Sequence, residues 1–182
     1  MAKKMKILAA IFTAVFVAFV AVYQFHKNDL ILTMGITFGT FAYHFLMRLA
    51  VGTTVDLIFH NRMDYTKWWF RPRGFEKKLY ELLKVKKWKK DIPTYDPDTF
   101  SAKKHSLEEL AQATCQTEIV HEIIVLLSFL PILLTIPFGA LSVFLITSIL
   151  AALIDCVFVI LQRYNRPRLL RLIAIDQKKK SR

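Results

Sequence analysis

The chain has 182 residues, of which 54% are apolar and 15 are phenylalanines, yet its formal net charge is +12. Such apolar content and such charge coexist when they are segregated, and here long apolar runs alternate with basic stretches. The composition therefore favours an integral membrane protein over a soluble domain. Because the basic stretches adjoin the apolar runs, anionic lipid headgroups explain the charge better than nucleic acid does.

Four apolar stretches are long enough for transmembrane helices, which need about 20 residues each. We place these spans at residues 7–25, 30–58, 119–136 and 140–161. The first span is long for a signal peptide and no cleavage site follows it, so we interpret it as a retained helix. Pro131 predicts a kink in the third span, and the Pro137-Phe138-Gly139 break predicts a reversal before the fourth.

The lysines and arginines outside the spans predict the orientation. Of the 26 basic residues, 24 lie before the first span, in residues 61–117, or in the tail 163–182. The positive-inside rule assigns these three segments, and so both termini, to the cytoplasm. We therefore predict an all-α fold: a single, multi-pass membrane domain of about four transmembrane helices with cytoplasmic interfacial helices, in the cell (plasma) membrane.

The middle segment, residues 61–117, is too long for a plain turn. Its stretch 74–90 has apolar residues on one helical face, which predicts a basic helix lying in the membrane interface. These residues are Phe75, Leu79, Leu82 and Leu83. Residues 91–100 are proline-broken and predict a loop. Ser106 and Glu109 form a capping box for a helix that begins at Leu107 and can continue into the third span.

The tail has Pro167 near its start and a short apolar surface among its arginines. We interpret it as a further helix on the cytoplasmic face. A basic anchor that only fixes the orientation is the alternative.

Ionisable residues in or near the spans are candidate functional groups, because a charge in hydrocarbon costs at least about 2.5–3.5 kcal/mol. They are His44, Arg48, Asp56, Glu118, His121, Glu122 and Asp155. Glu118 and His121 are three residues apart and share a helix face. A carboxylate beside an imidazole can orient a general base, so this pair is our catalytic candidate.

Simpler explanations exist for the same residues. Arg48 can form a structural ion pair with Asp56 or Asp155, and Glu118 and His121 can be interfacial residues at a helix end. The E-x-x-H motif of Glu118 and His121 occurs in bundle metal sites, but those sites need two such motifs and this chain has one. We expect no metal site and no cofactor. The two cysteines, Cys115 and Cys156, are in no paired motif and are interpreted as ordinary thiols.

The string QRYNRPR, Gln162 to Arg168, combines three arginines with an amide and a tyrosine at the end of the fourth span. Planar guanidinium groups suit phosphate or carboxylate, and in an enzyme that uses acyl-CoA this string would be placed to meet the cytosolic phosphates. Positive-inside anchoring is the alternative, although anchoring requires only charge.

The longer string VILQRYNRPRLLRL resembles the C-terminal signature of the glycosyl-diaponeurosporenoate acyltransferases of the staphyloxanthin pathway. VKKWK, residues 85–89, followed by Ile92-Pro93, resembles the basic V-x-x-W-K segment of that family. TEIVHE, residues 117–122, resembles its E-x-x-H motif at the start of a membrane helix. The three pieces have the family's order and cover roughly the second half of the chain.

The resemblance implies a small helical membrane protein that esterifies a sugar hydroxyl of a glycosylated carotenoid carboxylate with a fatty acyl chain. Carried over by motif, the implied functional positions are Trp88, Lys89, Glu118, His121, Gln162, Arg163, Tyr164, Asn165, Arg166, Pro167 and Arg168.

We therefore expect a membrane acyltransferase whose partners are membrane lipids, a lipid-soluble acceptor and a fatty acyl donor. His121, oriented by Glu118, would deprotonate the acceptor hydroxyl. The arginines would bind the donor phosphates; they are Arg163, Arg166 and Arg168. Asn165 or Arg48 would stabilise the oxyanion. Two alternatives remain: a non-catalytic lipid-binding or scaffold protein, and a transferase of other chemistry, such as methyl transfer to a polyprenyl lipid, although no glycine-rich phosphate loop is present.

Overall fold

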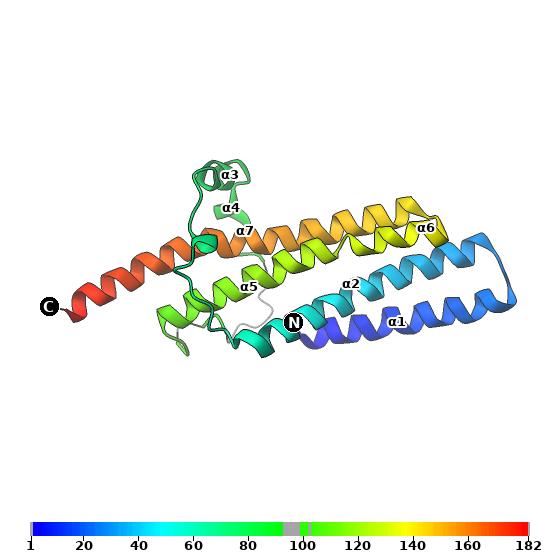
Figure 1. The fold of residues 1–182 in the computed structure, drawn as a ribbon, viewed down its shortest axis with the longest axis horizontal. Helices are drawn as coiled ribbons and strands as arrows, with labels where there is room; N and C mark the ends of the chain where they lie inside the picture. The colour runs from blue at the N-terminus through cyan, green and yellow to red at the C-terminus, as the bar shows by residue number, and fades with distance from the viewer. Residues whose placement is uncertain (1, 93–98, 102, 182) are drawn as a thin grey trace. The chain divides into compact units, whose positions relative to one another are not determined.

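The computed structural model describes residues 2–92, 99–101 and 103–181, and the regular secondary structure in those ranges is helical (Figure 1). In chain order the elements are α1 (Ala2–Phe25), α2 (Asp29–Phe59), η1 (Trp68–Phe70), α3 (Glu76–Leu82), α4 (Val85–Trp88), α5 (Leu107–Leu127), η2 (Leu130–Leu134), α6 (Thr135–Phe138) and α7 (Leu141–Lys180). The predicted loop at residues 91–100 lies largely outside the described residues, as does Pro93.

Four helical segments of the described chain are long and apolar enough to cross a membrane, which confirms the predicted all-α membrane fold. They are Lys3–Phe25, Asp29–Phe59, Leu107–Phe138 and Leu141–Lys180. The third segment changes geometry at Pro131, where α5 has ended and the 3-10 helix η2 includes the proline. The reversal predicted before the fourth span occurs at Gly139, whose φ of 66° lies in the region that glycine adopts most readily.

The capping box at the start of α5 is present as predicted. The backbone N–H of Ser106 donates to Glu109 Oε2 at 2.8 Å, and the backbone N–H of Glu109 donates to Ser106 Oγ at 3.2 Å. These two bonds satisfy donors that have no partner within the helix. The helix begins at Leu107 and continues without a break to Leu127, so it enters the third apolar segment as expected.

Two predictions about helix boundaries are wrong. The tail is not a separate helix: α7 runs from Leu141 to Lys180 with Pro167 inside it. Pro167 has no N–H for the carbonyl of Arg163, and we attribute the continuity of α7 to the side-chain contacts that Arg163 and Arg166 make just before the proline, described below. The stretch 74–90 is not one helix either, because Lys84 takes a left-handed conformation, with φ 51°, between α3 and α4. The Trp88 indole donates to the Leu83 carbonyl at 2.9 Å and stabilises this break.

The chain forms two compact units. One, the basic unit, contains Thr54–Glu122 and Cys156–Arg182, and the other, the apolar unit, contains Ala2–Thr53 and Ile123–Asp155. Helices α2, α5 and α7 each contribute residues to both units.

Aromatic rings and one ion pair hold the apolar unit. The ring of Phe12 lies 5.4 Å from those of Phe41 and Phe45, which packs α1 against α2 (Figure 1). Arg48 of α2 forms an ion pair with Asp155 of α7, so the alternative of a structural pair is confirmed for these two residues. Arg48 also donates to the backbone carbonyls of His44 and Ala151, at 3.0 and 3.1 Å.

The two cysteines are thiols, as expected: Cys115 is buried, Cys156 is half-buried, and neither forms a disulfide within the described residues. No group of three or more metal-ligating side chains is found among the residues that the structure describes.

Candidate active site

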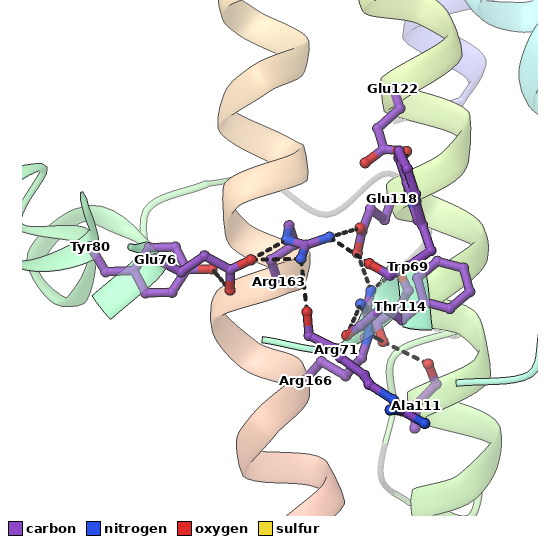
Figure 2. A network of polar contacts seen from close by, with 11 residues as sticks. Trp69, Arg71, Glu76, Tyr80, Ala111, Thr114, Glu118, Glu122, Arg163 and Arg166 are labelled. Atoms are coloured by element: carbon purple, nitrogen blue, oxygen red, sulfur yellow. Dashed lines mark hydrogen bonds and ion pairs between the residues drawn. The ribbon is translucent and has the colours of Figure 1, made fainter. Parts of the chain in front are cut away.

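The basic unit contains a buried cluster of two arginines and two glutamates (Figure 2). Arg163 and Arg166 are three residues apart and project from one face of α7. Glu118 comes from α5 and Glu76 from α3. The four side chains carry two positive and two negative charges, so the cluster balances its own charge.

Glu118 lies between the two arginines. Its side chain is fully buried, and so is that of Arg166, of which 1% is exposed. Arg163 Nη1 donates to Glu118 Oε1 at 2.5 Å, and Arg166 Nη2 donates to Glu118 Oε2. Each carboxylate oxygen therefore has a guanidinium partner, and the pairings fasten α5 to α7.

Glu76 accepts two hydrogen bonds from the other side of Arg163. The Nε and Nη2 groups of Arg163 donate to Glu76 Oε1 at 2.8 and 2.6 Å, and the hydroxyl of Tyr80 donates to Oε2 at 2.9 Å. Burial and the hydrogen bond to Glu76 raise the pKa of Tyr80 above its usual value, which keeps the phenol protonated and available as a donor. These contacts attach α3 to the same point of α7.

Backbone carbonyls around η1 complete the cluster. Arg163 donates to the carbonyls of Trp69 and Arg71, at 3.2 and 3.1 Å, and Arg166 donates to the carbonyl of Phe70 at 3.3 Å. The Arg166 guanidinium also lies 4.9 Å from the centre of the Phe70 ring. The polypeptide that follows the second apolar helix is thereby held against α7.

These contacts bear on the expectation that Arg163 and Arg166 bind donor phosphates. A guanidinium has five N–H donors, and all five of Arg163 have acceptors within the protein. Arg166 uses four, two of them on the hydroxyl and carbonyl oxygens of Thr114. The structure therefore favours a structural role for both arginines.

His121 lies on α5, one turn beyond Glu118. Its ring stacks on Phe158 of α7, with the ring centres 4.6 Å apart and the planes inclined by 9°. The side chain is half-buried. The next residue, Glu122, accepts a hydrogen bond from the Trp69 indole at 3.0 Å. Both oxygens of Glu118 accept hydrogen bonds from arginines. The predicted pairing of His121 with Glu118 stays a prediction.

A second polar group lies where α4 meets α7. Lys89 Nζ donates to Asn165 Oδ1 at 3.1 Å and lies 4.7 Å from the centre of the Tyr164 ring. The Tyr164 ring in turn packs edge to face against Tyr80, at 5.3 Å. The predicted residues Lys89, Tyr164 and Asn165 are thus brought together beside the buried cluster. Arg168, three residues after Asn165, is exposed.

The remaining predicted residues have other surroundings. Gln162 is buried, with 7% of its surface exposed. Trp88 is the residue that stabilises the break after α3. Arg48 belongs to the apolar unit and pairs with Asp155 there.

Sequence reasoning did not identify Glu76, Tyr80 or Thr114 as parts of this site. Glu76 stands among lysines in a stretch that reads as a basic amphipathic helix, and its neighbours give no sign of an arginine 87 residues away. Two acidic residues in this strongly basic segment, Glu76 and Glu81, were the available signal.

The sequence of this part of the chain matches the model of a known protein family. The glycosyl-4,4'-diaponeurosporenoate acyltransferase model matches residues 66–175, more than half of the sequence and all of the buried cluster. No curated protein and no solved structure matches the chain. The match supports an acyltransferase of the carotenoid pathway over a scaffold or a methyltransferase. The chain belongs to the glycosyl-4,4'-diaponeurosporenoate acyltransferase family.

Proposed function

We propose that this enzyme transfers a fatty acyl group to a sugar hydroxyl of a lipid-soluble, glycosylated carotenoid-type acceptor at the cytoplasmic face of the plasma membrane. The family description supports the acceptor class. The four apolar helices and the excess of basic residues in three segments support the location. The acyl donor in this proposal is a thioester of coenzyme A, which is delivered from the cytosol.

The placement of His121 is the observation that carries the proposal. Two histidines fall within the residues matched by the family, His105 and His121. His105 is exposed before the start of α5, and its Nδ1 lies 3.6 Å from Glu109. His121 is half-buried on α5, one turn from the arginine-bound Glu118 and stacked on α7. An imidazole held in this way is suited to act as a general base.

The reaction needs one proton carrier. As the acceptor oxygen attacks the thioester carbonyl, His121 accepts the hydroxyl proton and the new carbon–oxygen bond forms. The carbon–sulfur bond then breaks, and the imidazolium returns the proton to the departing thiolate. The products are the ester and free coenzyme A, and no further reactant is required.

The buried cluster positions this base. Because Glu118 is tied to Arg163 and Arg166, the turn of α5 that carries His121 is fixed against α7. The exposed side chains of Trp68, Phe75 and Leu82 on the basic unit suit contact with the membrane interface, where a lipid-soluble acceptor is concentrated.

The test is a reconstituted acyl transfer. The purified protein in lipid nanodiscs receives palmitoyl-CoA and a glycosylated carotenoid carboxylate, and mass spectrometry detects the acylated product. The matched control is the same carotenoid acid without its sugar. We expect ester from the glycosylated acceptor alone. Equal acylation of both acceptors, or none of the glycosylated one, would refute the proposed acceptor.

A further inference from the structure

Three cations outside the buried cluster, Lys86, Lys89 and Arg168, lie close together where α4 meets α7. We propose that Lys89, Arg168 and Asn165, with Lys86 beside them, form a binding site for a phosphate group, and that this phosphate belongs to the acyl donor. The second part of the proposal rests on the proposed function. The first part, a phosphate site, does not.

The geometry brings these groups together from two elements. Lys86 lies in α4 and Lys89 caps its end, three residues later and on the same side. On α7, Asn165 and Arg168 are three residues apart and share a face. The hydrogen bond from Lys89 to Asn165, at 3.1 Å, joins the two elements. The Tyr164 ring beneath Lys89 limits the directions in which the ammonium group can move.

The N–H donors of Lys89, Arg168 and Asn165 are available to a ligand, unlike those of the buried cluster, most of which have acceptors within the protein. Lys89 has three N–H donors and uses one on Asn165. Among the described residues, no carboxylate pairs with Lys89, and no acceptor is found for the five N–H donors of Arg168. The amide nitrogen of Asn165 can donate as well. An arriving anion would thus meet a guanidinium fork, an ammonium and an amide without displacing a protein partner.

The positive charges around Lys89 also indicate that the ligand is an anion. Burial and the nearby positive charges of Arg168 and Lys86 lower the pKa of Lys89 below its usual value. Several like charges held close together, for which the described part of the chain supplies no acidic partner, are stabilised when an anion binds among them. Phosphate, with several acceptor oxygens and up to two negative charges, fits a planar fork combined with a point charge.

A phosphate could come from two sources, the donor or the headgroup of an anionic lipid. The donor is favoured because the site adjoins the buried cluster that fixes His121: Tyr164, under Lys89, packs on Tyr80, which donates to Glu76. A donor anchored here by its phosphates would be held in the same unit as the proposed base.

Binding of coenzyme A by calorimetry tests the site directly. The full chain is placed in nanodiscs of phosphatidylcholine alone or with phosphatidylglycerol. The variants are Lys89→Gln and Arg168→Gln, and the matched control is Lys179→Gln, which removes an exposed charge near the end of α7. Arg168 is exposed, so its variant folds even if that of Lys89 does not, and circular dichroism checks both. We expect each of the two variants to weaken coenzyme A binding about tenfold and the control to leave it unchanged.

Each outcome decides between the parts of the proposal. Unchanged coenzyme A affinity in both folded variants overturns the donor site. If the variants instead keep their affinity for coenzyme A but retain less phosphatidylglycerol than wild type when they are extracted from the mixed nanodiscs, the phosphate belongs to lipid. No effect on either ligand overturns the phosphate site altogether. If wild-type protein binds coenzyme A through Lys89 and yet forms no ester, the proposed function fails while the site stands.

Discussion

Replacing Glu118 by Gln should be among the most destabilising conservative changes in this protein. The substitution keeps the size of the side chain and removes one negative charge from a cluster of two arginines and two glutamates, which leaves a net positive charge. Arg166, of which 1% is exposed, then has no anionic partner among its contacts. Breaking one partner of a buried ion pair costs about 3–5 kcal/mol, and we expect a loss in that range.

The measurement is the free energy of unfolding in mixed micelles, titrated with sodium dodecyl sulfate and followed by circular dichroism. Glu122→Gln is the matched control, because Glu122 is half-buried one turn later and accepts a neutral indole N–H, which an amide oxygen can also accept. We expect the control to lose less than about 1 kcal/mol. In a double-mutant cycle, Arg166→Gln should partly restore the Glu118→Gln protein, with a coupling of about 0.5–3 kcal/mol. Equal effects of the two glutamate substitutions would refute the claim that Glu118 holds α5 to α7.

Three further predictions follow from other parts of the molecule. In the apolar unit, Asp155→Asn should destabilise the protein by about 3–5 kcal/mol because Arg48 loses its anionic partner. Asp56→Asn, at an exposed carboxylate, should cost less than about 1 kcal/mol. The same titration measures both variants, and equal losses of stability would contradict the pairing of Arg48 with Asp155. In α3, the raised pKa of Tyr80 means that its phenol stays protonated while ordinary tyrosines ionise near pH 10. The 295 nm absorbance at about pH 10.5 should therefore be the same in Tyr80→Phe and wild type, and a deficit of one phenolate in the variant would contradict the raised pKa. For the topology, green fluorescent protein fused at either end should fluoresce, and alkaline phosphatase fused at either end should be inactive; active phosphatase at one end would overturn the cytoplasmic assignment.

The transmembrane helices and the start of α5 could be predicted because they depend on local requirements. A bilayer demands about 20 consecutive apolar residues, and the capping box at Ser106 and Glu109 is complete within four residues. The pairing of Arg48 with an acidic residue could be predicted as well, because an unpaired arginine inside a span is costly. Which acid it would choose, Asp56 or Asp155, depended on how the helices pack.

The course of α7 and the membership of the site could not be predicted in the same way. Pro167 ordinarily indicates a helix boundary, and contacts of Arg163 and Arg166 with residues of α3 and α5 outweigh that local preference. Such contacts join residues 45 to 87 positions apart, so neither spacing nor composition reveals them. The same contacts explain why two arginines that suit phosphate by chemistry are occupied by carboxylates and carbonyls.

Ester formation by the His121→Ala variant tests the central claim most directly. Reconstituted with palmitoyl-CoA and the glycosylated acceptor, the variant should lose at least about a hundredfold in turnover, as expected for a lost general base, while it inserts into membranes normally. His105→Ala, the other histidine in the matched residues, should keep wild-type turnover. Wild-type turnover in the His121→Ala protein would contradict the mechanism.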